Sequence, residues 1–155
     1  MTAIVKNILT DKLPEISQLS FVIDGANIAY ELKNSRNKPQ LSNIKTLMNK
    51  LDSMELTNYK IICDNSLRYH IDKRKGYYSF IKQKKIIETP SGAEADVFIL
   101  QYAYDNQSYI ISNDKFRDYF HIFDKKWIKK MRMSFVFINN EIYLDKLIKL
   151  TKIMS

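Results

Sequence analysis

The chain has 155 residues, of which 45% are hydrophobic, and we expect residues 1–155 to form a single domain with a buried core. Lys and Arg number 25 against 17 Asp and Glu, so the net charge is +8, and a surface of this charge attracts polyanions, nucleic acid first among them. The single cysteine, Cys63, excludes a disulfide framework and a zinc finger of ordinary spacing, which is typical of a cytoplasmic protein. No apolar stretch approaches the ~18 residues of a membrane span, and the N-terminus lacks the apolar run of a signal peptide, so we expect neither membrane insertion nor secretion.

Along the chain, short apolar runs of strand length alternate with longer segments whose apolar residues recur at helical spacing. Asn139 and Asn140 are typical of a tight hairpin turn between the last two strands. In chain order we predict a strand at 19–23, a helix at 41–54, a strand at 59–63, a helix at 71–83, a strand at 85–88, a helix at 93–104, a strand at 108–112, a short helix at 114–120, and strands at 134–138 and 141–144, followed by a C-terminal helix.

This alternation determines the expected fold class. Strands separated by helices are joined by right-handed crossovers, which place the strands parallel in one sheet with helices on both faces. We therefore predict a three-layer, Rossmann-like α/β sandwich with a mainly parallel central sheet. The last two strands should form an antiparallel C-terminal hairpin at the edge of this sheet.

Acidic and amide side chains follow three of the predicted parallel strands. Parallel strands end at the same edge of a sheet, so these side chains should share one crevice. Asp118 should lie one helical turn beyond Asp114, on the same face of the short helix. The residues expected at this crevice are Asp24, Asn27, Glu94, Asp96, Asn113, Asp114 and Asp118.

Several carboxylates in one crevice repel one another unless they take up protons or bind a cation. Hard oxygen ligands of this kind suit Mg²⁺, and Mn²⁺ can take its place. A metal ion held there polarises a phosphoryl oxygen and lowers the pKa of water, which is the chemistry of phosphodiester hydrolysis. The expected metal ligands are Asp24, Asp96, Asp114 and Asp118, with Glu94 as a further carboxylate.

Four segments, FVIDGANIAY, ETPSGAEADVFILQYA, YIISNDKFRD and MRMSFVFINNEIYL, together resemble the Regnase (MCPIP) type of NYN/PIN-like ribonuclease over about residues 19–144. The resemblance implies a PIN-like fold and a Mg²⁺-dependent endoribonuclease that hydrolyses single-stranded or loop RNA. Where many relatives have two adjacent acids, this chain has Glu94, Ala95 and Asp96, with Asp96 at the second position. The catalytic residues that the resemblance implies are Asp24, Asn27, Asp96, Asp114 and Asp118.

Basic residues near the predicted strand ends are the best candidates for contacts with RNA phosphates. The resemblance implies this role for Arg68 and Arg117 in particular. Lys146 and Lys149, on the C-terminal helix, are weaker candidates. The residues predicted to bind RNA are Arg68, Arg74, Lys75, Lys115 and Arg117.

Each acid also has an ordinary structural interpretation. Asp24 could end a strand at a turn, and Asp96 and Asp114 could be acids in the first turn of a helix. Asp118 could be an exposed partner of a lysine, and Glu94 could be a solvated acid. For Asp64, at the end of the second strand, a turn or capping role is favoured.

Three other functions compete with the ribonuclease. A catalytically silent RNA-binding or scaffold protein on the same fold is the nearest alternative. A haloacid-dehalogenase-type phosphatase is disfavoured because it needs a second Asp two residues after the first, where this chain has Ala26. A nucleotide-binding Rossmann protein is disfavoured because the sequence has no glycine-rich phosphate loop. A homodimer could form through the hairpin near 135–143 or through the C-terminal helix.

Overall fold

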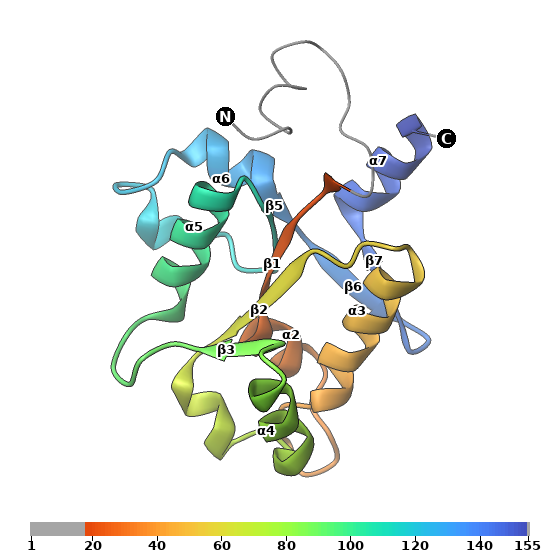
Figure 1. The fold of residues 1–155 in the computed structure, drawn as a ribbon, viewed down its shortest axis with the longest axis vertical. Helices are drawn as coiled ribbons and strands as arrows, with labels where there is room; N and C mark the ends of the chain where they lie inside the picture. The colour runs from red at the N-terminus through yellow and green to blue at the C-terminus, as the bar shows by residue number, and fades with distance from the viewer. Residues whose placement is uncertain (1–17, 155) are drawn as a thin grey trace.

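Figure 1 shows the fold in a computed structural model, which describes residues 18–154. Strands and helices alternate over most of the described residues, and short 3₁₀ helices lie in some of the connecting loops. In chain order the elements are β1 (Phe21–Asp24), α2 (Gly25–Glu31), α3 (Leu41–Ser53), β2 (Tyr59–Cys63), η2 (Asn65–Tyr69), α4 (Arg74–Lys82), β3 (Ile86–Glu88), α5 (Ala95–Asn106), β4 (Tyr109–Ile111), η3 (Arg117–Tyr119), α6 (Lys125–Met131), β5 (Arg132–Met133), β6 (Phe135–Ile138), β7 (Glu141–Leu144) and α7 (Asp145–Met154).

The central sheet has five parallel strands in the order β3-β2-β1-β4-β5. The chain builds outward from β1 to β3 and then crosses over to β4 on the other side of β1, so the strand order reverses between β1 and β4. Such a switch point opens a crevice at the carboxyl ends of the two strands. The prediction of a mainly parallel, three-layer α/β fold is confirmed.

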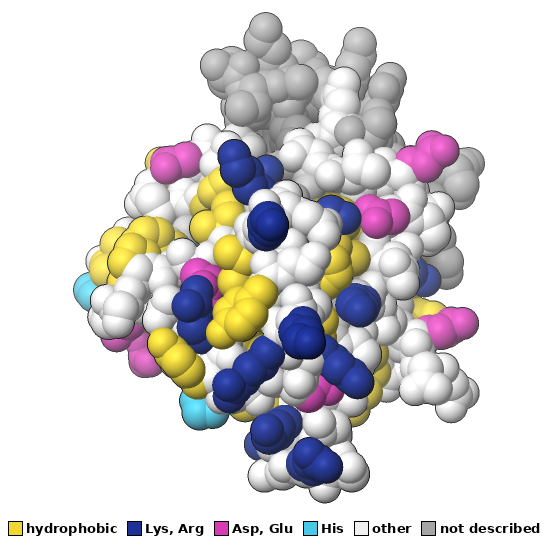
Figure 2. All heavy atoms as spheres, turned by 60° about the horizontal axis from the view of Figure 1, so that its bottom comes forward, with side chains coloured by type: hydrophobic (Ala, Val, Ile, Leu, Met, Phe, Trp, Pro, Cys, Tyr) yellow, Lys and Arg dark blue, Asp and Glu magenta, His cyan; other side chains and the backbone are white. Residues whose placement is uncertain are grey.

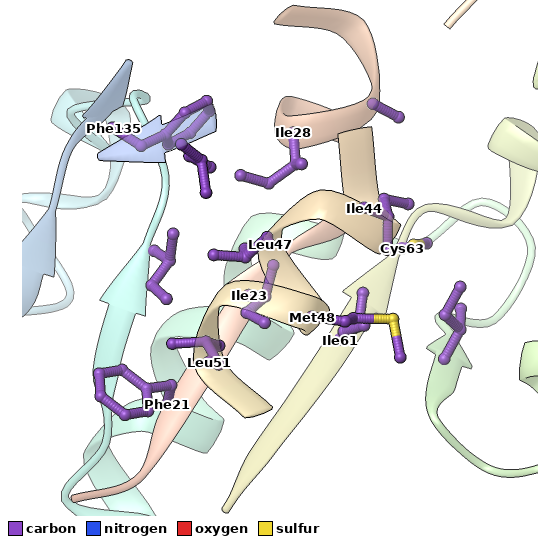
Figure 3. Close-up of a cluster of buried hydrophobic side chains, with 14 of the residues drawn as sticks. Phe21, Ile23, Ile28, Ile44, Leu47, Met48, Leu51, Ile61, Cys63 and Phe135 are labelled. Carbon is purple, nitrogen blue, oxygen red and sulfur yellow. The ribbon is translucent and has the colours of Figure 1, made fainter. Parts of the chain in front are cut away.

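Helices cover both faces of this sheet, and the strands supply alternate residues to two cores. On one face, Phe21 and Ile23 of β1 pack with α3 residues such as Leu47 in the cluster that Figure 3 shows. On the other face, Val22 packs with Ile99 and other apolar residues of α5 and α6. All four residues of β1 are buried, as expected for a central strand that helices cover on both sides.

The C-terminal hairpin differs from its prediction in one respect. β6 and β7 pair in antiparallel register as expected, with Asn139 and Asn140 in the turn at φ values of 50° and 65°. However, they form a separate two-stranded sheet, and the fifth parallel strand is β5, so the assignment of 134–138 to the central sheet was wrong. Ser134 accounts for the break, because it exchanges hydrogen bonds with Asp145 where the next sheet residue would be. The hairpin instead buries Phe135 in the core beside α3.

The predicted short helix at 114–120 is also wrong. Only the single 3₁₀ turn of η3 forms there, because Phe116 is buried at a φ of 54°, which interrupts a right-handed helix. Conversely, α2 and α6 were not predicted, since each has only seven residues and no long apolar period. In the part of the chain that the structure describes, none of the helices combines the length and apolarity that a membrane span requires.

Candidate active site

The site is built around Asp24, the last residue of β1. Its Oδ1 accepts a hydrogen bond from the backbone N of Asn27 at 3.3 Å and so caps α2, and its Oδ2 accepts one from Ser112 Oγ at 2.8 Å. Burial raises the pKa of this carboxyl to about 6, with a smaller increase from the charge of Asp114, although both hydrogen bonds lower it. A carboxylate that is this rigid and poorly hydrated gains stability from a nearby cation.

Gly25 allows α2 to start directly after β1. A Cβ atom at this position would lie 2.2 Å from Cys63 Sγ and 2.9 Å from Ile61 Cγ2, both of them buried side chains of the neighbouring strand β2. Only glycine permits such a close approach of helix and sheet. The dipeptide Asp24-Gly25 therefore serves to turn the chain from strand to helix with the carboxylate at the turn.

Ser112 follows β4 and was not predicted as a site residue. Besides donating to Asp24, its Oγ accepts a hydrogen bond from the backbone N of Asp114 at 3.1 Å. The side chain is fully buried and links the acids at the ends of β1 and β4. The sequence holds little signal for this role, because a serine after a strand is usually a solvated turn residue.

Asn27 and Asn113 join the same two strand ends by a second route. Asn27 Oδ1 accepts a hydrogen bond from the backbone N of Asn113 at 2.9 Å. Asn113 then exchanges two side-chain hydrogen bonds with the backbone of Phe135, at 2.9 and 3.1 Å, and so ties β6 to the site. Asn27, predicted from the first motif, thus lies at the crevice and shapes its wall.

The predicted acids from the other segments lie around Asp24. Asp96, in the first turn of α5, is half-buried, and desolvation together with four neighbouring carboxylates raises its pKa to about 7. Those four neighbours are Asp24, Asp114, Glu94 and Asp118. The structure therefore brings all five predicted acids together, and their assignment as metal ligands stays a prediction.

Asp114 and Asp118 reach the crevice in a different way from the one predicted. They do not share one face of a helix, because Asp114 Oδ1 accepts a hydrogen bond from the backbone N of Phe116 at 2.8 Å in a tight turn. Asp118 follows in η3. Both nevertheless line one open cavity of about 510 Å³, with Asn113, Lys115 and Arg117.

Glu94 is the N-cap residue of α5 and is exposed. Its carboxylate accepts a hydrogen bond from the hydroxyl of Tyr119 and adds to the negative charge around Asp96. Although this chain has Glu94-Ala95-Asp96 where many relatives have two adjacent acids, it therefore still supplies two carboxylates to the same crevice.

Within residues 18–154, the crevice acids form no ion pair with a Lys or Arg side chain. Between residues 18 and 154 a single ion pair occurs, between Arg68 and Glu88. In a chain with a net charge of +8, five clustered acids without an ion pair concentrate negative charge at one place, although Lys115 and Arg117 line the same cavity. A cation from solution would offset this negative charge.

The donor chemistry of the crevice fits Mg²⁺, which prefers carboxylate oxygens. Across residues 18–154, however, no group of three or more His, Cys, Asp or Glu side chains is arranged so that it could hold a metal ion by itself. Mg²⁺ usually keeps several waters and uses only one or two carboxylates, so a complete cage of protein ligands is not needed.

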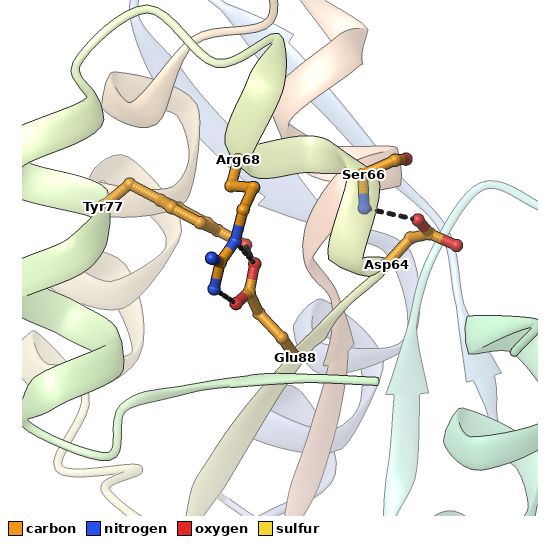
Figure 4. Close-up of polar contacts among 5 residues, drawn as sticks. All are labelled: Asp64, Ser66, Arg68, Tyr77 and Glu88. Carbon is orange, nitrogen blue, oxygen red and sulfur yellow. Dashed lines mark hydrogen bonds and ion pairs between the residues drawn. The ribbon is translucent and has the colours of Figure 1, made fainter. Parts of the chain in front are cut away.

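Figure 4 shows how Arg68, predicted to bind RNA, is engaged within the protein. Its Nε donates to Glu88 Oε2 at 3.1 Å and its Nη2 donates to Glu88 Oε1, while Tyr77 Oη donates to Oε2 at 3.0 Å. The guanidinium charge is therefore offset by the carboxylate at the end of β3. In the same view, Asp64 accepts a hydrogen bond from Ser66 N at 2.7 Å, which confirms its capping role.

The other predicted basic residues divide into two groups. Lys115 and Arg117 line the cavity beside Asp114 and Asp118. Arg74 and Lys75 are exposed at the start of α4, where Arg74 donates to the backbone O of Tyr69 at 2.7 Å. Figure 2 views the end of the molecule where α4 lies and shows Lys and Arg side chains gathered over its lower part. Phosphate groups of a polyanion can approach this end of the molecule.

A parallel α/β sheet whose switch point holds clustered carboxylates, on a strongly basic chain, defines the class of nuclease-like α/β domains. The family model for the Zc3h12a-like ribonuclease NYN domain matches residues 17–152, and the chain belongs to this family. The resemblance to NYN/PIN-like ribonucleases is thereby confirmed.

Solved structures with the same fold include two of nuclear proteinaceous (protein-only) RNase P 2, PRORP2, from Arabidopsis thaliana. Both align with a TM-score of 0.66, at 19% and 21% sequence identity, over 93% and 92% of this chain. The matched part is 32% and 33% of those chains, so this chain spans about a third of their length. At this identity the likeness shows the shared fold. A comparison with curated protein sequences found no significant match.

Proposed function

We propose that this domain is a Mg²⁺-dependent endoribonuclease that hydrolyses phosphodiester bonds in single-stranded or loop RNA, and that Mn²⁺ can replace Mg²⁺. The observation that carries the proposal is the meeting of five carboxylates at the switch point of the sheet, none of which forms an ion pair within residues 18–154. Repulsion within such a cluster is relieved by a divalent cation. Membership in a ribonuclease family gives the reaction class.

The residues divide the work by their positions. One or two of Asp24, Asp96 and Asp114 would hold the cation together with waters, and the bound cation would polarise a phosphoryl oxygen and acidify a water. Asp118, exposed at the mouth of the cavity, is suited to orient a water by hydrogen bonding. Glu94 adds negative charge beside Asp96.

Asn27 and Arg117 act on the substrate in this proposal. Asn27 Oδ1 is used within the protein, and in residues 18–154 its Nδ2 has no acceptor, so this amide can donate to a phosphate oxygen. Arg117 lies beside Asp114 in the open cavity and can offset the charge that develops on the phosphate in the transition state. Lys115, in the same cavity wall, can hold the neighbouring phosphate.

One observation supports a second candidate, a catalytically silent RNA-binding protein. The described acids include no group of three that could hold a metal ion as they stand. A protein that kept only the fold and the basic surface would have this arrangement. Against it, a silent protein gains nothing from five clustered acids, because their charges repel the phosphates it binds.

The test is cleavage of an internally labelled single-stranded RNA and of a matching stem-loop, in Mg²⁺, in Mn²⁺ and in EDTA. Asp114→Asn should abolish cleavage and leave folding intact, because the amide oxygen can still accept from Phe116 N. Asp105→Asn, which removes an exposed acid from the far end of α5, is the matched control and should cleave like the wild type.

Metal-dependent cleavage that Asp114→Asn alone loses would support the proposal. Cleavage that persists in EDTA, or that Asp114→Asn retains, would contradict it. If the wild type binds both RNAs but cuts neither in any metal, the silent RNA-binding protein becomes the better description.

A further inference from the structure

A second cavity, of about 640 Å³, lies beside the acidic crevice where η3, α6, β5 and the start of α7 meet. Six of the side chains that line it are basic, and a single one, Asp145, is acidic. Phe120 and Ile128 provide an apolar part of the wall. The six basic residues are Lys115, Arg117, Lys125, Lys129, Arg132 and Lys146.

None of these six cations forms an ion pair with a carboxylate of residues 18–154, where the one pair is Arg68 with Glu88. Two of them are held in place by neutral acceptors. Arg132 Nη1 donates to the backbone O of Ser112 at 3.1 Å, and Lys146 Nζ donates to the carbonyl O of Lys130 at 2.9 Å, at the end of α6. Neutral acceptors orient these groups without cancelling their charge.

Lys146, a weak candidate from its place on the C-terminal helix, is thus part of a built cationic wall. Partial burial lowers the pKa of its ammonium group, and the neighbouring charges of Arg132 and Lys149 lower it further, opposed by Asp145. The Asp145 carboxylate is itself used by the backbone, because it accepts hydrogen bonds from Ser134 N and Lys146 N. An anion that entered the cavity would relieve the repulsion among the cations.

The basic cavity and the acidic crevice share part of a wall. Lys115 and Arg117 line both the 640 Å³ cavity and the 510 Å³ cavity that contains Asp114 and Asp118. A phosphate chain in the crevice therefore meets the Lys115–Arg117 wall first and the remaining cations next. The volume of the basic cavity falls within the ~300–1,000 Å³ of ordinary ligand sites, enough for a nucleotide unit of the strand.

We propose that this basic cavity binds the backbone phosphates of the RNA strand on one side of the scissile bond. The proposal rests on the proposed ribonuclease function, since it takes the acidic crevice as the place of cleavage. It assigns RNA contacts to Lys125, Lys129, Arg132 and Lys146, outside the residues that the sequence predicted. Contacts to phosphates fix the register of the strand and carry little base specificity.

The matched test uses α6, which carries lysines on two faces. Lys125→Gln with Lys129→Gln removes two cavity cations one helical turn apart. Lys126→Gln with Lys130→Gln removes the same charge at the same spacing from exposed positions that do not line the cavity. Both pairs should fold like the wild type, because the four side chains are exposed.

Binding is measured by fluorescence anisotropy of an end-labelled single-stranded RNA in EDTA, over a series of salt concentrations. Two phosphate contacts fewer should make the negative slope of log K against log salt shallower by about 1.4, equivalent to roughly 25-fold weaker binding at 0.1 M salt. We expect this loss for the Lys125 and Lys129 pair and at most about a twofold change for the control pair. Equal losses in the two pairs would overturn the proposal, because only net charge would then matter.

Cleavage in Mg²⁺ separates this proposal from the one on which it rests. Short substrates are extended by a few nucleotides on either side of the cut, and the wild type should gain kcat/KM from extension on one side. The Lys125→Gln, Lys129→Gln variant should lose that gain in kcat/KM and should still cleave the shortest substrate. If this variant kept the gain, the proposal would be overturned. If the wild type never cleaves but this variant alone loses binding, the cavity is an RNA site and the ribonuclease proposal fails.

Discussion

Replacing Asp24 by Asn should change the stability of the metal-free protein in a pH-dependent way. Burial raises the pKa of this carboxyl from 3.8 to about 6, so the folded state favours the neutral form. The wild type therefore loses stability as the pH rises from the unfolded pKa near 3.8 through the folded pKa near 6. That pKa difference corresponds to roughly 3 kcal/mol of unfolding free energy, which the neutral Asn side chain does not lose.

The substitution also has a cost that does not depend on pH. An Asn side chain can keep the hydrogen bond from Asn27 N, but its amide NH₂ cannot accept from Ser112 Oγ as the second carboxylate oxygen does. One lost hydrogen bond costs about 1 kcal/mol. The variant should therefore be about 1 kcal/mol less stable than the wild type near pH 3.5 and about 2 kcal/mol more stable near pH 7.5.

The assay is urea unfolding in EDTA at several pH values, with the free energy of unfolding compared at each pH. Asp105→Asn removes an equal charge from an exposed position on α5, so its difference from the wild type should stay small at every pH. If the proposed site is correct, saturating Mg²⁺ should stabilise the wild type more than Asp24→Asn, because the proposed cation would bind the ionised Asp24 carboxylate. A difference between Asp24→Asn and the wild type that is the same at pH 3.5 and 7.5 would refute the inferred burial of charge.

Two further substitutions test the contacts that hold Asp24 in position. Ser112→Ala removes the donor to Asp24 and the acceptor for Asp114 N, so it should cost about 1–3 kcal/mol in urea unfolding. The Ser112 hydrogen bond lowers the pKa of Asp24, so Ser112→Ala should raise that pKa. At sub-saturating Mg²⁺, the increase of the cleavage rate with pH should then occur at a higher pH, and an unchanged pH profile would contradict the contact between Ser112 and Asp24. Gly25→Ala places a Cβ 2.2 Å from Cys63 Sγ and should destabilise the fold by at least about 1–3 kcal/mol. Combining it with Cys63→Ala should restore part of that loss in thermal unfolding, and strict additivity of the two changes would argue against the contact.

Much of the site could be predicted because it depends on where strands end. Asp24 ends β1, Asp96 lies in the first turn of α5, and Asp114 follows β4. Parallel topology then brings these three acids to one edge of the sheet. The path of the chain between Asp114 and Asp118 could not be predicted in this way. Helical spacing suggested one face of a helix, but the burial of Phe116 imposes a positive φ and a turn.

The sequence by itself determined the α/β class, the parallel sheet, the acidic crevice and the positive charge of the chain, because hydrophobic period and residue type are local properties. Only the tertiary structure decided which polar groups meet across long separations in the chain. Ser112 meets Asp24 across the β1–β4 switch point, and Lys125 shares a cavity with Lys146 although 20 intervening residues separate them in the sequence printed above. These pairings depend on how helices and strands pack, and no local pattern in the sequence encodes that packing.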